Sequence, residues 1–255
     1  MRARNVHEAE NIDNLIRNDA WLTEARAGIA EGDVYIVRAV LDKSLLSNIR
    51  SYLTTVGGSS LPNYHPIAVG APNSHRLNKW DPRSYVRGCF HQFVFYPWNE
   101  DAFGLFALSR AVYQLKNSLG GLDPDRFLAP TPDDGCIARI AFQYYPSGGG
   151  ALNKHTDPVD YHQLTVPTTL LSAKGESFAQ GGAYAILQNG EQLMLDDLID
   201  PGDVVFFNAS VEHGVAPVDP DVPMNWLDFR GRWMMLFSVN RLADNAGIGN
   251  STDLG

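Results

Sequence analysis

The chain has 255 residues, of which 44% are hydrophobic and 19% are charged. This balance is typical of an ordinary soluble protein with one large core or two small ones. The net charge is −9, and the Lys and Arg residues are scattered without a cluster, so we expect no nucleic-acid partner and no anionic membrane partner. No run of residues approaches the roughly 18 apolar positions of a membrane span.

The N-terminus and the cysteines indicate a cytoplasmic protein. Residues 1–11 are charged and lack the apolar segment of a signal peptide. The two cysteines, Cys89 and Cys136, have no CxxC spacing, so we expect reduced, mostly buried thiols.

The first half of the chain is predicted to be rich in helix. Apolar residues recur there at steps of three and four, the spacing of one helix face. Glycines follow these segments, at Gly32, at Gly57-Gly58 and at Gly120-Gly121, where we expect the helices to end. The predicted elements are one or two helices over 7–30, helices over 41–56 and 101–119, and strands over 34–37 and 90–98.

Residues 57–86 are rich in Gly, Pro, Ser, Asn and His, and we expect a long irregular loop. Loops of this length in a compact domain are usually functional or disordered. The simplest interpretation of His65, His75 and Arg76 is that they are ordinary loop residues. The functional alternative is that this loop covers a substrate cavity. For His91, in the strand that follows, we expect a structural role.

From Cys136 onward the pattern changes to short strands separated by Gly and Pro turns, which is typical of a β-sandwich or barrel such as the jelly roll. The strand over 136–145 alternates in character. Ala138, Ile140, Phe142 and Tyr144 lie on one side, and Arg139, Gln143 and Tyr145 lie on the other. Further strands are predicted over 164–171, 181–187, 204–207, 213–215 and 232–239, with a hairpin turn at Asn189-Gly190.

Three residues of this half could bind a metal. His155 and Asp157 are separated by one position, so on a strand their side chains point to the same face. His213 could add a second imidazole. Two histidines and one carboxylate on one face of a metal leave open positions, an arrangement typical of non-haem Fe(II) oxygenases.

Arg232 begins an otherwise apolar strand. An unpaired charge there would be costly, and a planar guanidinium suits a carboxylate, which it binds through two parallel hydrogen bonds. Gly181-Gly182, in the middle of the β region, allows close approach of the backbone.

These motifs together, with Pro201-Gly202-Asp203 before the strand that precedes His213, resemble the Fe(II)/2-oxoglutarate-dependent dioxygenases. The closest resemblance is to the branch of prolyl-hydroxylase-like enzymes and small-molecule hydroxylases, and it covers about residues 136–242. It implies a mainly β fold with some helix: a double-stranded β-helix, or jelly roll, supported by N-terminal helices. We therefore expect a single domain over 1–255, with helical support and substrate loops over 1–135, the catalytic core over 136–242 and a C-terminal tail over 243–255.

The resemblance also implies roles for individual residues. By position, His155, Asp157 and His213 are similar to the iron ligands, and Arg232 to the residue that binds the distal carboxylate of 2-oxoglutarate. Arg230 is the second candidate for that role, because the interval after His213 is longer than is usual in the family.

Other cavity residues are less certain from sequence. Tyr144 or Tyr145 could give the cosubstrate a hydroxyl, or both could be packing aromatics. Arg139 and Gln143 could face the interior and contact substrate or cosubstrate. His162 could contact substrate or support a metal ligand, but we expect it to be an exposed polar residue, and we expect Asp196 to be a solvated turn residue.

The implied reaction uses O2 and 2-oxoglutarate, releases succinate and CO2, and hydroxylates an unactivated C–H of a small-molecule metabolite. Desaturation, cyclisation and epimerisation use the same residues, whereas Asp157 argues against halogenation. Two other classes remain open: a cupin-like metal enzyme that does not use 2-oxoglutarate, and a non-catalytic jelly-roll binding module.

Overall fold

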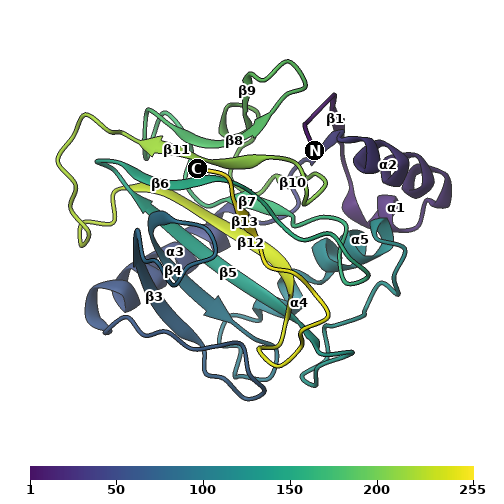
Figure 1. Ribbon diagram of the computed structural model, residues 1–255, viewed down its shortest axis with the longest axis horizontal. Helices are drawn as coiled ribbons and strands as arrows, with labels where there is room; N and C mark the ends of the chain where they lie inside the picture. The colour runs from purple at the N-terminus through teal and green to yellow at the C-terminus, as the bar shows by residue number, and fades with distance from the viewer.

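The computed structural model describes residues 1–255 and contains one curled, 13-stranded sheet with helices against its outer surface (Figure 1). The helices are α1 (Ile12–Ile16), α2 (Asp19–Glu31), α3 (Lys43–Ser59), α4 (Leu105–Leu108) and α5 (Arg110–Leu119), with a 3-10 turn η1 (Leu195–Asp197). None of the helices is both long enough and apolar enough to span a membrane.

The strands come from both halves of the chain. They are β1 (Val6–Ala9), β2 (Val34–Val37), β3 (Ser74–Lys79), β4 (Gly88–Phe95), β5 (Cys136–Pro146), β6 (Gly150–Thr156), β7 (Thr168–Leu170), β8 (Gly182–Ile186), β9 (Gln192–Met194), β10 (Val204–Phe206), β11 (His213–Val218), β12 (Gly231–Arg241) and β13 (Thr252–Asp253). Their order is β1-β2-β10-β7-β12-β5-β4-β6-β11-β8-β9, with β3 beside β4 and β13 beside β6. The predicted jelly roll with supporting helices is confirmed.

The antiparallel pair of β5 and β12 lies at the centre of the sheet and separates two environments. Side chains alternate across a strand, and the outward residues of this pair, such as Phe142 and Phe237, are fully buried beneath the helices. The inward residues, such as Gln143 and Met234, line a cavity inside the roll. The alternation predicted for residues 136–145 therefore decides which side chains can reach a ligand.

The helices bury their apolar faces against this outer surface. Leu46, Ile49 and Leu53 of α3 and Val112 and Leu115 of α5 belong to the same core cluster as the outward residues of β5 and β12. The side chain of Asp42 caps the start of α3 by accepting a hydrogen bond from the Leu45 amide. The helices thereby support the wall of the roll that carries the cavity.

The first half differs from its prediction in two places. Helix α3 continues through Gly57-Gly58 to Ser59. A Cβ at Gly57 would lie 2.8 Å from the Phe229 ring, so this glycine allows close packing and does not end the helix. The segment over 101–119 is two helices, α4 and α5, which meet at Ser109.

Three strands were not predicted, because their residues lack a β pattern. β1 lies in a segment with helical spacing and pairs with β2. β3 lies within the supposed loop over 57–86 and pairs with β4 along its whole length. The tail over 243–255 returns to the sheet, where β13 pairs with β6, so the C-terminus lies beside strands from the second half of the chain (Figure 1).

Candidate active site

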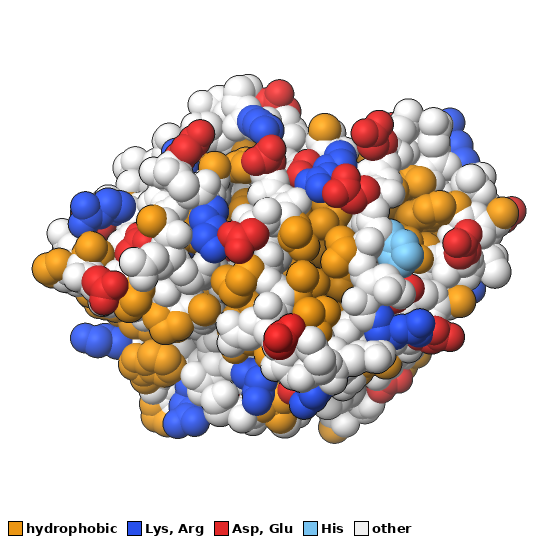
Figure 2. Space-filling view, turned by 90° about the horizontal axis from the view of Figure 1, so that it is seen from above, with side chains coloured by type: hydrophobic (Ala, Val, Ile, Leu, Met, Phe, Trp, Pro, Cys, Tyr) orange, Lys and Arg blue, Asp and Glu red, His pale blue; other side chains and the backbone are white.

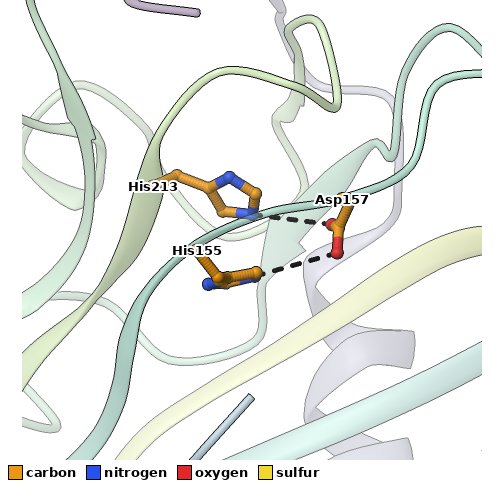
Figure 3. A group of neighbouring side chains, drawn as sticks. All are labelled: His155, Asp157 and His213. Carbon is orange, nitrogen blue, oxygen red and sulfur yellow. Dashed lines mark ion pairs between the residues drawn. The ribbon is translucent and has the colours of Figure 1, made fainter. Parts of the chain in front are cut away.

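His155, Asp157 and His213 converge at one point on the inner surface of the roll (Figure 3). His155 near the end of β6 is paired with His213 at the start of β11, and Asp157 follows β6 directly. The Nε2 atom of His155 lies 3.9 Å from Oδ1 of Asp157, and that of His213 lies 3.6 Å from Oδ2. The potential ligand atoms all lie within 4.8 Å of one another.

Backbone carbonyls orient both imidazoles. Nδ1 of His155 donates to the Asn153 carbonyl at 2.9 Å, and Nδ1 of His213 donates to the Val211 carbonyl at 2.8 Å. With the proton on Nδ1, each Nε2 carries a free lone pair directed toward Asp157. Burial and the charge of His155 lower the pKa of His213 to about 4, so this ring is neutral and able to bind a metal at neutral pH.

The carboxylate of Asp157 is held by the C-terminal segment. The Ser251 hydroxyl donates to Oδ1 at 2.6 Å. Burial raises the pKa of Asp157, but the two histidines and this hydrogen bond outweigh burial, and the pKa is lowered. Asp157 is therefore ionised, and the set offers two imidazole nitrogens and one anionic oxygen, which suits a divalent transition metal.

The three residues open onto a cavity of about 390 Å³. Its walls come from β5 and β12 on one side and from β6, β8 and β11 on the other, and the segments around β3 and after β12 also contribute. The expectation that part of the region 57–86 covers a cavity agrees with the positions of His65 and Arg76 in this wall. His75 points away from it, stacked on Phe93 at 4.7 Å between ring centres.

Arg232 lies at one end of this cavity and is only 2% exposed. Its Nε and Nη2 atoms donate to the Asp196 carboxylate at 2.5 and 2.9 Å. Nη1 is buried and has no hydrogen-bond partner. Burial lowers the pKa of Arg232, but the charge of Asp196 outweighs that effect and the pKa is raised, so the group is a permanent cation whose Nη1 is free to donate.

The expectation that Asp196 is a solvated turn residue is wrong. It lies in η1, it is 3% exposed, and it also accepts a hydrogen bond from the Ala183 amide at 2.9 Å. A Cβ at Gly182 would come within 2.3 Å of this carboxylate. Gly181-Gly182 therefore allows the close approach that we expected from the sequence, and the group that approaches is the side chain of Asp196.

The alternation of side chains along β5 distinguishes Tyr144 from Tyr145. Tyr144 points outward into the core, where its ring stacks on Trp233 and its hydroxyl donates to the Arg230 carbonyl at 3.1 Å. It does not line the cavity, so the cofactor-binding role predicted for Tyr144 does not fit its position. Tyr145 does line the cavity; its hydroxyl donates to Gln143 at 2.6 Å, and Arg232 lies over its ring.

The remaining candidates are also placed by the fold. Gln143 and Arg139 both line the cavity. Arg230 precedes β12 and lies on the surface, away from the cavity, with its guanidinium 3.7 Å from Asp228. His162, expected to be exposed, is buried and lines the cavity. Its neighbours in sequence are polar, and only the packing of the roll around it reveals its burial.

Solved structures of 2-oxoglutarate-dependent oxygenases share this fold. A prolyl-4-hydroxylase of Pseudomonas putida has a TM-score of 0.53 and 16% identity over 86% of this chain and 98% of its own. A prolyl hydroxylase from Trichoplax adhaerens, in complex with a hypoxia inducible factor peptide fragment, has a TM-score of 0.51 and 14% identity over 90% and 93% of the two chains. JOX2, in complex with 2OG, Fe and JA, has a TM-score of 0.52 and 15% identity over 96% and 77%.

The sequence matches no protein-family model and no curated protein. At identities of 14–16%, the similarity establishes the fold: the chain has the double-stranded β-helix of these oxygenases. What this protein does must then be argued from its own residues.

Proposed function

We propose that this protein is an Fe(II)- and 2-oxoglutarate-dependent oxygenase that hydroxylates a small-molecule metabolite. One observation carries the proposal. A single cavity contains two histidines and a carboxylate with free metal-binding atoms, and also a buried guanidinium with an unpartnered N–H, that of Arg232. A cupin-like enzyme or a binding module would not require the second feature.

His155, Asp157 and His213 would hold the iron, which when bound supplies the activation of O2 for oxidation of a C–H bond coupled to decarboxylation of 2-oxoglutarate. The chain prepares these ligands in advance. The carbonyls of Asn153 and Val211 keep the imidazole protons on Nδ1, and Ser251 keeps the carboxylate oriented. Such supporting hydrogen bonds fix the tautomer and the direction of each ligand.

Arg232 would bind the distal carboxylate of 2-oxoglutarate. The Asp196 carboxylate accepts hydrogen bonds from Nε and Nη2 of Arg232 and so fixes the plane of the guanidinium, leaving Nη1 for the cosubstrate. Tyr145 lies at the same end of the cavity, but its hydroxyl proton is donated to Gln143, so Arg232 is the donor for this carboxylate. A charge-assisted hydrogen bond formed in such a buried place is stronger than one formed at the surface.

The size of the cavity supports a small-molecule substrate. Pockets for small molecules usually measure about 300–1,000 Å³, and this one measures about 390 Å³. A peptide is the alternative substrate class, because the Trichoplax adhaerens enzyme was crystallised with a peptide fragment. A peptide needs an open groove, whereas this cavity lies between the two walls of the roll.

Turnover provides the direct test. With Fe(II), 2-oxoglutarate and O2, the purified protein should release succinate, and a screen of metabolites should identify compounds that stimulate this release. The His155→Ala variant should bind Fe(II) at least tenfold more weakly and release no succinate. The proposal fails if the wild-type protein neither turns over 2-oxoglutarate nor shows a thermal shift with Fe(II) and 2-oxoglutarate.

The role of Arg232 is tested by affinity. Arg232→Ala should weaken 2-oxoglutarate binding by about 10–100-fold, the loss expected for about 1.5–3 kcal/mol of charge-assisted hydrogen bonding. Arg230→Ala, two positions away on the surface, is the matched control and should change the affinity less than twofold. Calorimetric titration of 2-oxoglutarate into the Fe(II)-loaded proteins measures both. An effect of Arg230→Ala instead would show that the assignment is wrong.

A further inference from the structure

The cavity contains more positive charge than 2-oxoglutarate requires. Among the charged side chains that line it, Asp157 is the sole carboxylate, and the others are five arginines, Arg76, Arg83, Arg139, Arg232 and Arg241. The whole chain has a net charge of −9, and on the face shown in Figure 2 the basic and acidic side chains are interspersed. Positive charge is therefore concentrated inside the roll.

Three of these arginines have partners in the protein. Arg232 is paired with Asp196, and Arg83 with Asp81 at 2.6 Å. Arg241 donates to the carbonyl of Asn245 and to the side chain of Asn250, and thereby holds the segment that follows β12.

Arg139 and Arg76 have no acidic partner. Neither forms an ion pair, and the Nε atom of each is buried without a hydrogen-bond partner. Arg76 donates only to the Ser84 hydroxyl and stacks over the Tyr64 ring at 4.8 Å, and the side chain of Arg139 donates no hydrogen bond. Leaving buried donors unsatisfied is costly, so these two side chains are arranged for a partner that is not part of the protein.

The two guanidinium groups face the same cavity. Arg76 on β3 is in register with Gln92 on β4, and Gln92 with Gln143 on β5, so Arg76 lies on the same inner surface as Arg139, which is four positions before Gln143. Arg76 and Arg139 thus reach the cavity from one inner surface, although they come from β3 and β5.

Arg139 is remote from the end proposed for 2-oxoglutarate, and Arg76, in register with Gln143, lies between the two ends. In the β5–β12 register, Arg139 is paired with Ser238, whereas Tyr145 is paired with Arg232. Six strand positions separate the two ends, which corresponds to about 20 Å at ~3.3 Å per residue. The five-carbon chain of 2-oxoglutarate, held at Arg232, cannot reach Arg139 as well.

We propose that the prime substrate is a small organic anion whose carboxylate or phosphate is bound by Arg139 and Arg76, an inference that rests on the proposed oxygenase function. A guanidinium pair binds such groups through parallel, charge-assisted hydrogen bonds. Apolar lining residues, among them Val94, Leu236 and Ile248, accept the carbon skeleton. The anion is anchored at this end, so the carbon to be oxidised is held toward His155 and Asp157.

The test is a calorimetric titration of the Fe(II)-loaded protein under anaerobic conditions with saturating 2-oxoglutarate, which occupies the Arg232 end. The probes are benzoate and phenyl phosphate, with benzamide as the neutral counterpart of nearly the same shape. We expect at least one anion to bind tenfold or more tightly than benzamide. The tighter of the two anions identifies the class of anionic group.

Variants assign the effect to these residues. Arg139→Gln and Arg76→Gln should each weaken binding of the preferred anion by tenfold or more, with benzamide and 2-oxoglutarate affinities unchanged. Arg83→Gln removes a charge from the same cavity wall, but that charge is already paired with Asp81, so anion affinity should change less than threefold. Thermal unfolding of each variant verifies that it is folded.

The inference is overturned if neither anion binds more tightly than benzamide, or if Arg139→Gln weakens the binding of 2-oxoglutarate instead of the binding of the anion. Failure of the oxygenase proposal gives a different result. Wild-type protein would then not bind 2-oxoglutarate, whereas the anion titration repeated without 2-oxoglutarate still reports on Arg139 and Arg76.

Discussion

At the scale of single residues, the buried pair of Asp196 and Arg232 determines what one end of the cavity can bind. Both side chains are almost fully buried, and a buried pair is weak evidence for stability because desolvation offsets much of the attraction. Its value lies in geometry: Nε and Nη2 of Arg232 are bonded to Asp196, and Nη1 is left for a ligand. Gly182 is part of the same arrangement, because any side chain there would displace the carboxylate.

Removing the carboxylate charge should be costly. Asp196→Asn leaves the Arg232 charge uncompensated, and we expect a loss of about 3–5 kcal/mol in the free energy of unfolding. Asp197→Asn is the matched control, because the Asp197 carboxylate, next in sequence to Asp196, is half exposed and forms a surface ion pair with Lys174. That variant should lose less than about 1 kcal/mol. Urea denaturation measures both, and equal losses would contradict this interpretation.

At the scale of elements, α5 supports the outer surface of β5 and β12 but carries an unexpected cation on its buried face. Lys116 is 1% exposed, and its ammonium has no hydrogen-bond partner. Burial lowers its pKa to about 7. The helix tolerates this residue because the long aliphatic part of the side chain packs like its apolar neighbours.

Replacing this lysine should stabilise the protein in a pH-dependent way. The pKa of Lys116 falls on folding from the ordinary value of 10.5 to about 7, so the destabilisation is absent above pH 10.5 and grows as the pH falls toward 7. Lys116→Met should therefore increase the free energy of unfolding by a few kcal/mol, on the order of 2–4, at pH 7 and by little at pH 10. Denaturation at the two pH values measures this, with the exposed Lys43→Met as control. An equal effect at both pH values would contradict it.

At the scale of the whole molecule, distant parts of the chain close the roll around the site. β3 and β4 from the first half continue the sheet from β5, and the last residues return to β6. Histidines from different regions are buried as a result. His91 on β4 is hydrogen-bonded to His75, with 2.9 Å between Nδ1 of His91 and Nε2 of His75. His162 lies in the cavity wall. The closed roll keeps both rings neutral.

Acid should therefore weaken the fold. Burial and neighbouring positive charges lower the pKa of His91 and of His162 from 6.5 to about 4, so the unfolded chain binds more protons in this range. Stability is expected to be nearly constant above pH 6.5 and to fall from pH 6.5 to about 4, by on the order of 1–3 kcal/mol for each histidine. Urea denaturation across this range measures the slope. His91→Gln should reduce it, and an unchanged slope would contradict the assignment to this residue.

The local pattern of the sequence was sufficient for several features. Alternation along residues 136–145 identified Arg139, Gln143 and Tyr145 as one face, and the spacing of His155 and Asp157 identified two groups on one side of a strand. These properties repeat every two residues and do not depend on which strand lies alongside. A β-sandwich or barrel followed from the same short strands and turns, and the family resemblance specified the jelly roll.

Only the tertiary structure decided how these faces are used. The ion pair of Asp196 with Arg232, the hydrogen bond of Ser251 to Asp157, and the cavity shared by Arg76 and Arg139 bring together residues that are 36, 94 and 63 positions apart. Such contacts depend on the register of neighbouring strands and on the curl of the sheet. Neither is encoded in the period of a single segment, because both arise when the whole apolar surface is buried at once. The sequence thus determined the chemistry available to this protein, and the closed roll decided which groups meet in one cavity.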